Sequence, residues 1–188
     1  YDEHNNPISH RYFSWNGTDW TGGYAGQDFV NGYDSLFNLI SQIEIVVPDS
    51  IYIYYYSFTY DEHGNVLTDT LDRKVNGVYE KLYFNFYSYD ANHNLLSRTT
   101  MEWRSDEEEY LYASWNGRIT YTYDDNNNRT SHVRETFDYN IMAWRVDGWN
   151  PKIEWTYLDD NAVLIRSFYF DESTGEWVNG TSGHVDLL

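Results

Sequence analysis

The chain has 188 residues, with 30 acidic against 12 basic side chains and a formal net charge of −18. It contains no cysteine, but it is rich in large rings, with 20 Tyr, 9 Phe and 8 Trp. Length alone predicts one domain or one short array of repeats, and the aromatic content excludes a disordered acidic tail. The charge makes nucleic acid and anionic membranes poor partners, and the lack of cysteine excludes disulfides and thiolate metal sites.

No stretch approaches the roughly 18 consecutive apolar residues of a membrane-spanning helix, so we expect no membrane insertion. The sequence opens at Tyr1, where a signal peptide would have Met and a basic region. We therefore expect a processed or excised segment.

One pattern recurs along the chain: Tyr-Asp, three residues, Asn, and then an apolar residue with a Ser or Thr shortly after. Five copies are intact, at Tyr1-Asp2 with Asn6, Tyr33-Asp34 with Asn38, Tyr60-Asp61 with Asn65, Tyr89-Asp90 with Asn94, and Tyr123-Asp124 with Asn128. A decayed sixth copy starts at Tyr157, with Leu158 and Ala162 in place of the Asp and the Asn. The copies divide one repeat domain into approximate units 1–32, 33–59, 60–88, 89–122, 123–156 and 157–188.

A second turn signal follows each Tyr by about 15 to 17 positions, so each copy should hold two turns and two strands. These signals are Asn16-Gly17, Pro48-Asp49, Asn76-Gly77, Ser105-Asp106, Asn140 and Ser173-Thr174. Between the turns, in residues 51–60, 81–89 and 153–157, side chains alternate with a period of two, which is typical of half-buried antiparallel strands. Residues 36–45 approach helical spacing but fit a strand equally. We predict an all-β fold of tandem antiparallel β-hairpin repeats, in an extended, curled or coiled meander of about twelve strands.

The Tyr60–Val66 segment resembles the Tyr-Asp repeats of Rhs-type and teneurin-like shells. Tyr1-Asp2 with Asn6, Trp15-Asn16-Gly17 and Trp20 resemble the longer Trp-rich hairpin repeats of secreted Bacteroidota proteins. The resemblance implies an extracellular scaffold, adhesin stalk or spacer without catalysis.

Residues 124–135 carry a calcium-like spacing, with Asp124, Asn126, Asn128 and Glu135 at loop positions 1, 3, 5 and 12. Arg129 stands where the loop needs glycine, and the repeat itself supplies Asp and Asn at these positions. We therefore favour a turn without metal, with calcium as the alternative and no other cofactor.

The tryptophans allow two interpretations. They pack across strands beside the turns, or they form flat platforms for a carbohydrate ligand. The packing role is favoured, and the residues are Trp15, Trp20, Trp103, Trp115, Trp144, Trp149, Trp155 and Trp177. Three Asp-Ser/Thr-apolar triplets, which resemble the O-glycosylation pattern of Bacteroidota, mark Ser35, Ser50 and Thr70.

Neither a nucleophile elbow nor a phosphate-binding loop is present, so we predict no catalytic residues and no enzyme activity. The sequence favours a secreted or surface-attached structural or adhesive module. The alternatives are a carbohydrate-binding module and a fibre subunit that joins copies through unpaired strand edges. Expected partners are cell-surface glycans, other surface proteins or copies of the chain itself.

Overall fold

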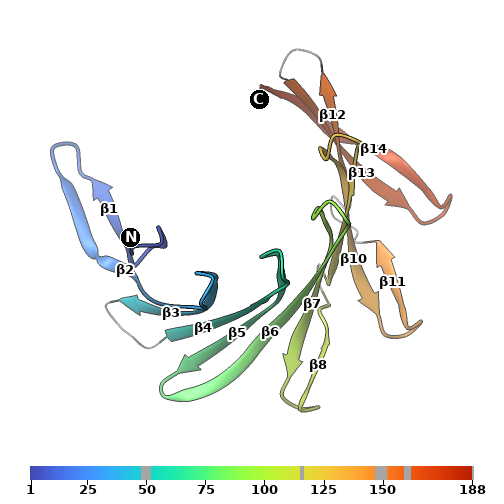
Figure 1. The fold of residues 1–188 in the computed structure, drawn as a ribbon. Coiled ribbons are helices and arrows are strands. Elements are labelled where there is room, and N and C mark those ends of the chain that lie inside the picture. The colour runs from blue at the N-terminus through green and yellow to red at the C-terminus, as the bar shows by residue number, and fades with distance from the viewer. Residues whose placement is uncertain (48–51, 115–116, 147–151, 159–161, 188) are drawn as a thin grey trace. The chain divides into compact units, whose positions relative to one another are not determined.

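The computed structural model describes residues 1–47, 52–114, 117–146, 152–158 and 162–187. These residues form fourteen strands and no helix, so none of their segments is a helix that could cross a bilayer. The predicted all-β fold is confirmed. The strands in Figure 1 are β1 Ser9–Trp15, β2 Trp20–Tyr33, β3 Leu39–Val47, β4 Tyr52–Tyr60, β5 Val66–Val75, β6 Val78–Tyr89, β7 Leu95–Arg104, β8 Glu109–Tyr112, β9 Arg118–Tyr123, β10 Arg129–Asp138, β11 Ala143–Val146, β12 Lys152–Leu158, β13 Ala162–Asp171 and β14 Glu176–Leu187.

The strands follow one another in a single antiparallel sheet, in the order β1-β2-β3-β4-β5-β6-β7-β9-β10-β12-β13-β14. Strands β8 and β11 lie off this path, because β8 pairs with β7 and β11 pairs with β10. Each of these short strands forms a hairpin that continues past the main ladder (Figure 1). A meander of this kind places alternate turns at opposite ends of the strands, so the Tyr-Asp turns fall at one end and the second turns at the other.

The two strands beyond the predicted twelve arise from interruptions of returning strands. Thr100 donates its amide to the carbonyl of Gly117, and its own carbonyl accepts the amide of Ala113. Ala113 and Gly117 thus both bond to the single residue Thr100, as in an enlarged bulge, at the point where β8 is divided from β9. The returning strand after β10 is likewise divided into β11 and β12.

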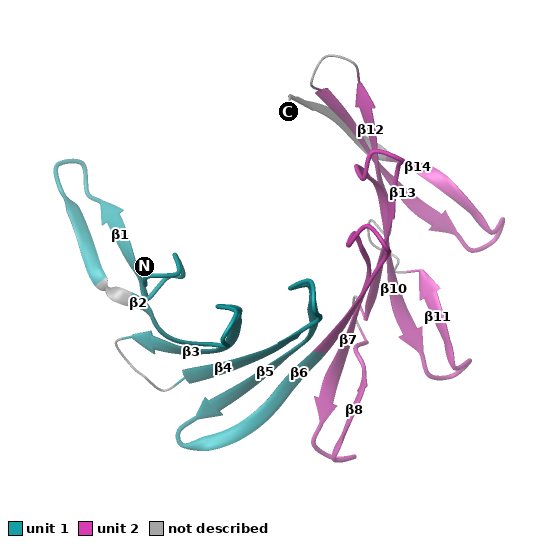
Figure 2. Cartoon of the chain, in the orientation of Figure 1, with its two compact units in different colours: residues 1–84 teal, residues 85–188 magenta. Residues whose placement is uncertain are grey.

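The chain consists of two compact units, residues 1–84 and 85–188, with the boundary inside β6 (Figure 2). In the first unit, Gly26 is the single buried residue among those whose burial is described. In the second unit, the buried residues are all small or β-branched: Thr99, Ala113, Gly117, Ala162 and Val163. No described aromatic ring is buried, so cross-strand contacts within each unit replace a conventional core.

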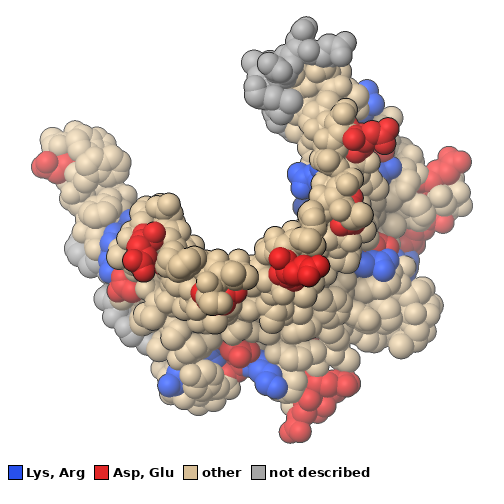
Figure 3. Space-filling view, viewed as in Figure 1, with Lys and Arg blue, Asp and Glu red and all other residues tan. Residues whose placement is uncertain are grey.

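Acidic side chains are spread over both units. In the view of Figure 3, Asp and Glu appear as several separate groups, with Lys and Arg between some of them. On this face the acidic side chains are therefore not gathered into a single patch.

Residues 36–45, where helical spacing competed with strand spacing, divide between a turn and β3. Leu36 and Phe37 lie exposed in the turn, and the strand begins at Leu39. Pairing with β2 and β4 decides the outcome, since it satisfies the backbone groups of β3 on both sides.

Candidate functional site

The five intact Tyr-Asp elements form turns of the same geometry. In each turn the Asp amide donates to the carbonyl of the Asn four residues later, at 2.9 to 3.0 Å. The amide three residues after the Asp donates back to the Asp carbonyl, at 3.0 to 3.2 Å. That donor has a positive φ in every copy, as expected for a turn closed by a bulge, and the donors are Asn5, Phe37, Gly64, His93 and Asn127.

The Asp side chain of each turn is bound within the turn itself. Its Oδ1 accepts the amides two and four residues later at 2.8 to 2.9 Å. In four copies the Asn side chain donates to Oδ2 at 2.8 to 3.1 Å, and this bond is the main cause that lowers the pKa of Asp34, Asp61, Asp90 and Asp124. These carboxylates remain ionised and serve as acceptors for the turn, which makes them unsuitable as general acids.

The first copy differs in the partners of Asp2 Oδ2 and of the Asn6 side chain. Tyr33 donates its hydroxyl to Asp2 Oδ2, and Asn6 donates its side-chain amide to the Tyr33 oxygen at 2.8 Å. The bond from Tyr33 is the largest cause that lowers the pKa of Asp2. Burial, followed by the bond to Asp2, raises the pKa of Tyr33.

Other repeat tyrosines link each turn to the one before it. Tyr60 donates its hydroxyl to the carbonyl of Leu39 at 2.7 Å, Tyr123 to Leu95 at 3.0 Å, and Tyr157 to Arg129 at 3.2 Å. Each acceptor directly follows the Asn of the preceding copy. Tyr157 makes this bond although residues 159–161, at the decayed sixth turn, lie outside the described residues.

The Ser or Thr after each Asn has a defined partner in three copies. Its hydroxyl bonds to the hydroxyl of the residue that precedes the Tyr: Thr68 to Thr59 at 2.6 Å, Ser97 to Ser88 at 2.7 Å, and Ser131 to Thr122 at 2.7 Å. These bonds lie across the two strands that flank the turn. The recurrent residues of the pattern thus all contribute to one hairpin and its link to the previous hairpin.

The residues with calcium-like spacing divide between two environments. Asp124, Asn126 and Asn128 belong to a repeat turn, and the Asp124 carboxylate is bound there as described above. Glu135 lies six residues beyond the start of β10, roughly 20 Å along the strand at 3.3 Å per residue, where Arg118 donates to it twice at 2.7 and 2.8 Å. In the described part of the chain, no three His, Asp or Glu side chains are grouped to hold a metal ion.

Aromatic residues pair across the strands beside the second turns. Trp15 faces Trp20 with ring centroids 5.5 Å apart, and Phe170 faces Trp177 at 5.3 Å. Trp103 packs edge-on against Tyr110 at 5.0 Å. The rings of Trp15 and Trp20 are 54% and 68% exposed, which distinguishes this pair from the others, whose tryptophans are half-buried.

Two further tryptophans stack under arginines. The Arg118 guanidinium lies 4.5 Å from the ring centroid of Trp144, and the Arg129 guanidinium lies 4.4 Å from that of Trp155. Both rings are half-buried, and such contacts stabilise a sheet by about 0.5 to 1 kcal/mol at exposed sites. Trp115 and Trp149 lie outside the described residues.

The three residues marked by the glycosylation-like triplets occupy different places. Ser35 is exposed in the turn between β2 and β3, and Thr70 is half-buried in β5. Ser50 lies outside the described residues.

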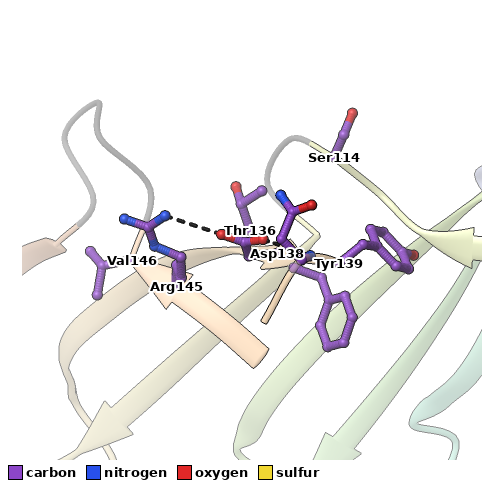
Figure 4. Close-up of a pocket in the computed structure, with 8 residues that line it drawn as sticks. Ser114, Thr136, Asp138, Tyr139, Arg145 and Val146 are labelled. Atoms are coloured by element: carbon purple, nitrogen blue, oxygen red, sulfur yellow. Dashed lines mark hydrogen bonds and ion pairs between the residues drawn. The ribbon is translucent and has the colours of Figure 1, made fainter. Parts of the chain in front are cut away.

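A cavity of about 470 Å³ lies at the hairpin formed by β10 and β11. Two of its lining residues form an ion pair, in which Arg145 donates to Asp138 Oδ2 at 3.1 Å (Figure 4). Arg145 also donates to Glu172. The bond from Arg145 is the first cause that lowers the pKa of Asp138. The lining residues are Ser114, Thr136, Phe137, Asp138, Tyr139, Asn140, Arg145 and Val146.

Sequence reasoning marked Asn140 as a turn residue but missed this cavity. Asp138 and Arg145 are seven residues apart and become neighbours when the turn pairs Thr136 with Arg145. The turn at Asn140 was the one sequence feature that indicated it, since oppositely charged residues on the two sides of a hairpin turn can pair across the strands.

His132 is half-buried in β10. Its ring centroid lies 5.3 Å from that of Trp155, and its Nε2 has no hydrogen-bond partner within the described ranges. Burial, with smaller contributions from Arg134 and Arg129, lowers the pKa of His132 to about 4. Protonation of this ring therefore opposes folding.

Comparison with known proteins finds similarity at the level of structure. No protein-family model matches the chain, and no curated protein matches it. A crystal structure of a protein of unknown function from Bacteroides fragilis has a TM-score of 0.58 and 12% identity, covering 71% of this chain and 91% of that chain.

Two DUF3836 family proteins, from Bacteroides vulgatus and Parabacteroides distasonis, match with a TM-score of 0.31 and 11% identity each. They cover 71% of this chain and 97% and 89% of their own chains. At these identities the similarity to the Bacteroides fragilis structure is a similarity of β fold alone.

Proposed function

We propose that this chain is an extracellular structural or adhesive module, which presents a row of hairpins and performs no catalysis. The observation that carries the proposal is the bonding of the repeat turns. In four copies both carboxylate oxygens of the Asp accept hydrogen bonds from their own turn, and the hydroxyls of Tyr60 and Tyr123 bond to the turn before them. Residues used in this way position strands, and these four carboxylates are not available for acid-base chemistry. The resemblance of the repeats to those of secreted proteins supports a location outside the cell.

The adhesive role can be tested with beads coated with the full chain and applied under flow to mucin and to epithelial cells. We expect more retained beads than with an albumin coating. The Trp15→Ser, Trp20→Ser double variant should reduce retention, whereas Leu36→Ser, at another exposed apolar residue, should leave it unchanged. Retention equal to the albumin coating would refute adhesion.

The structural role has a separate test in digestion by chymotrypsin, which cleaves beside aromatic residues. Because the chain is so rich in them, an unfolded form would be cut at many sites. We expect the folded chain to survive and the combined Tyr60→Phe, Tyr123→Phe and Tyr157→Phe variant to be digested faster, since it loses three links between turns. Rapid digestion of the unaltered chain would contradict a structural role.

Carbohydrate binding is a second candidate, supported by the exposure of Trp15 and Trp20. Their rings meet at the β1–β2 tip with large areas open to solvent, as a sugar-stacking surface requires. A glycan array tests it. Specific signals that disappear in the Trp15→Ala, Trp20→Ala variant would support the candidate, and an array without signals would exclude it.

A further inference from the structure

The cavity at the β10–β11 hairpin combines an aromatic ring with polar side chains that have no hydrogen-bond partner among the described residues. The side-chain amide of Asn140 and the hydroxyls of Ser114 and Thr136 make no hydrogen bond within the described residues, although all three residues line the cavity. Arg145 has five N–H groups and uses two of them, toward Asp138 and Glu172. Several donors and acceptors therefore remain available around one opening.

The ring of Tyr139 is held in a fixed position beside these groups. Its hydroxyl donates to the carbonyl of Tyr112 at 3.1 Å, and its ring lies 4.9 Å from that of Phe137. The residue is nevertheless 41% exposed. Tyr139 thus offers an anchored apolar surface at the edge of the cavity, and Figure 4 shows Asp138 between it and Arg145.

A cavity in the first unit provides a contrast. It measures about 390 Å³ and includes Asp2, Asn31 and Tyr33 among its lining residues. These polar side chains bond to one another: Asn31 donates to Asp2 at 3.0 Å, and Tyr33 donates to the same carboxylate. Its polar groups stabilise the turn, whereas several at the β10–β11 hairpin remain unused.

Electrostatics decides which ligands suit the β10–β11 cavity. The positive charge of Arg145 is offset by Asp138 and Glu172, and the chain carries a net charge of −18. A carboxylate or phosphate on the ligand would meet no excess positive charge. Both carboxylate oxygens of Asp138 already accept hydrogen bonds, one from Arg145 and one from the backbone amide of Asn140, which disfavours a cation.

We propose that the cavity lined by Thr136, Asp138, Tyr139, Asn140 and Arg145 binds an uncharged pyranose of a glycan. The C–H face of the sugar would pack on the Tyr139 ring, and the sugar hydroxyls would bond to the side-chain amide of Asn140 and the free N–H groups of Arg145. A volume of about 470 Å³ falls within the range of small-molecule sites. The site goes beyond the adhesive role proposed above and would supply that role with one of its ligands.

The test uses the full 188-residue chain labelled with ¹⁵N, titrated with the methyl glycosides of glucose, mannose and galactose up to about 50 mM. Sodium glucuronate serves as the charged comparison. We expect saturable shifts of the Asn140 and Arg145 signals with at least one neutral glycoside. Glucuronate should bind more weakly than that glycoside.

Variants identify the groups that bind. Asn140→Ala should weaken binding about 3- to 10-fold, the effect of one lost hydrogen bond, and Tyr139→Ala should reduce it below detection. Tyr139→Phe keeps the ring and should bind within about 3-fold of the unaltered chain. Asn126→Ala is the matched control, because this exposed amide lies at the opposite end of β10 and should leave binding unchanged.

Three results would overturn the proposal: no saturable shift with any neutral glycoside, tighter binding of glucuronate, or shifts confined to the tip at Trp15 and Trp20. Equal binding by Asn140→Ala, Tyr139→Ala and Asn126→Ala would overturn it as well. Bead retention is measured independently, so a failure here and a failure of the adhesive role remain distinguishable.

Discussion

The substitution Tyr60→Phe removes one hydroxyl from the links between turns. In the folded chain this hydroxyl donates to the carbonyl of Leu39 at 2.7 Å, and burial raises the pKa of Tyr60, as expected for a phenol kept from water. The loss of one such bond should lower the free energy of unfolding by about 1 kcal/mol, within a range of 0.5 to 1.5 kcal/mol. For a chain of 188 residues, 1 kcal/mol corresponds to a melting-temperature decrease of roughly 2 to 4 °C.

Urea denaturation followed by circular dichroism measures this change, and Tyr52→Phe is its matched control. Tyr52 lies in the same strand, is 42% exposed, and its hydroxyl has no partner in the part of the chain described. Its substitution should change the free energy of unfolding by less than about 0.5 kcal/mol. If Tyr60→Phe and Tyr52→Phe have equal effects, the role assigned to the repeat tyrosines is refuted.

Three further predictions concern backbone strain, an ion pair and pH. Phe37 has a φ of 66°, so Phe37→Gly should be about 1 kcal/mol more stable than Phe37→Ala in urea denaturation; equal stabilities would argue against the left-handed turn. Arg118→Ala should lower the free energy of unfolding by about 2 kcal/mol, because it removes the paired bonds to Glu135 and the stack on the Trp144 ring. Arg166→Ala should lower it by less than about 0.5 kcal/mol. Similar losses in the two variants would contradict the ion pair. The pKa of His132 falls from 6.5 in the unfolded chain to about 4 in the folded chain. The contribution of the neutral ring to the free energy of unfolding should therefore be fully present above about pH 6.5 and be lost as the pH falls toward 4. After a discount for solvent screening, the loss at pH 5 should be about 1 to 2 kcal/mol. The urea midpoint of His132→Phe should depend less on pH over this interval, and an unchanged dependence would exclude this role.

The sequence contained the signals for most of the fold. The Tyr-Asp pattern and Asn16-Gly17 are local turn chemistry, in which a side chain or a positive φ determines the backbone within a few residues. Alternation of rings in residues 51–60 likewise predicted a strand, and the structure has β4 at Tyr52–Tyr60. Local signals of this kind can be interpreted without knowledge of the partner strand.

Features that depend on partners were missed. The division of β8 from β9 requires both Ala113 and Gly117 to bond to the single residue Thr100, and nothing in the local pattern of rings marks that register. The cavity at Arg145 depends on the pairing of β10 with β11 and on Glu172 from a later turn. The different exposures of Trp15 and Trp144 likewise follow from neighbours across the sheet, such as Arg118 above Trp144.

The claim on which the account depends is that the Tyr-Asp elements are copies of one turn in one environment. Hydrogen exchange measured by NMR tests it directly, at the amides of Asp34, Asp61, Asp90 and Asp124, each of which donates to an Asn carbonyl. The account predicts slow exchange with similar protection at all four sites. Exchange as fast as in an unfolded peptide, or protection that differs greatly among the four, would contradict it.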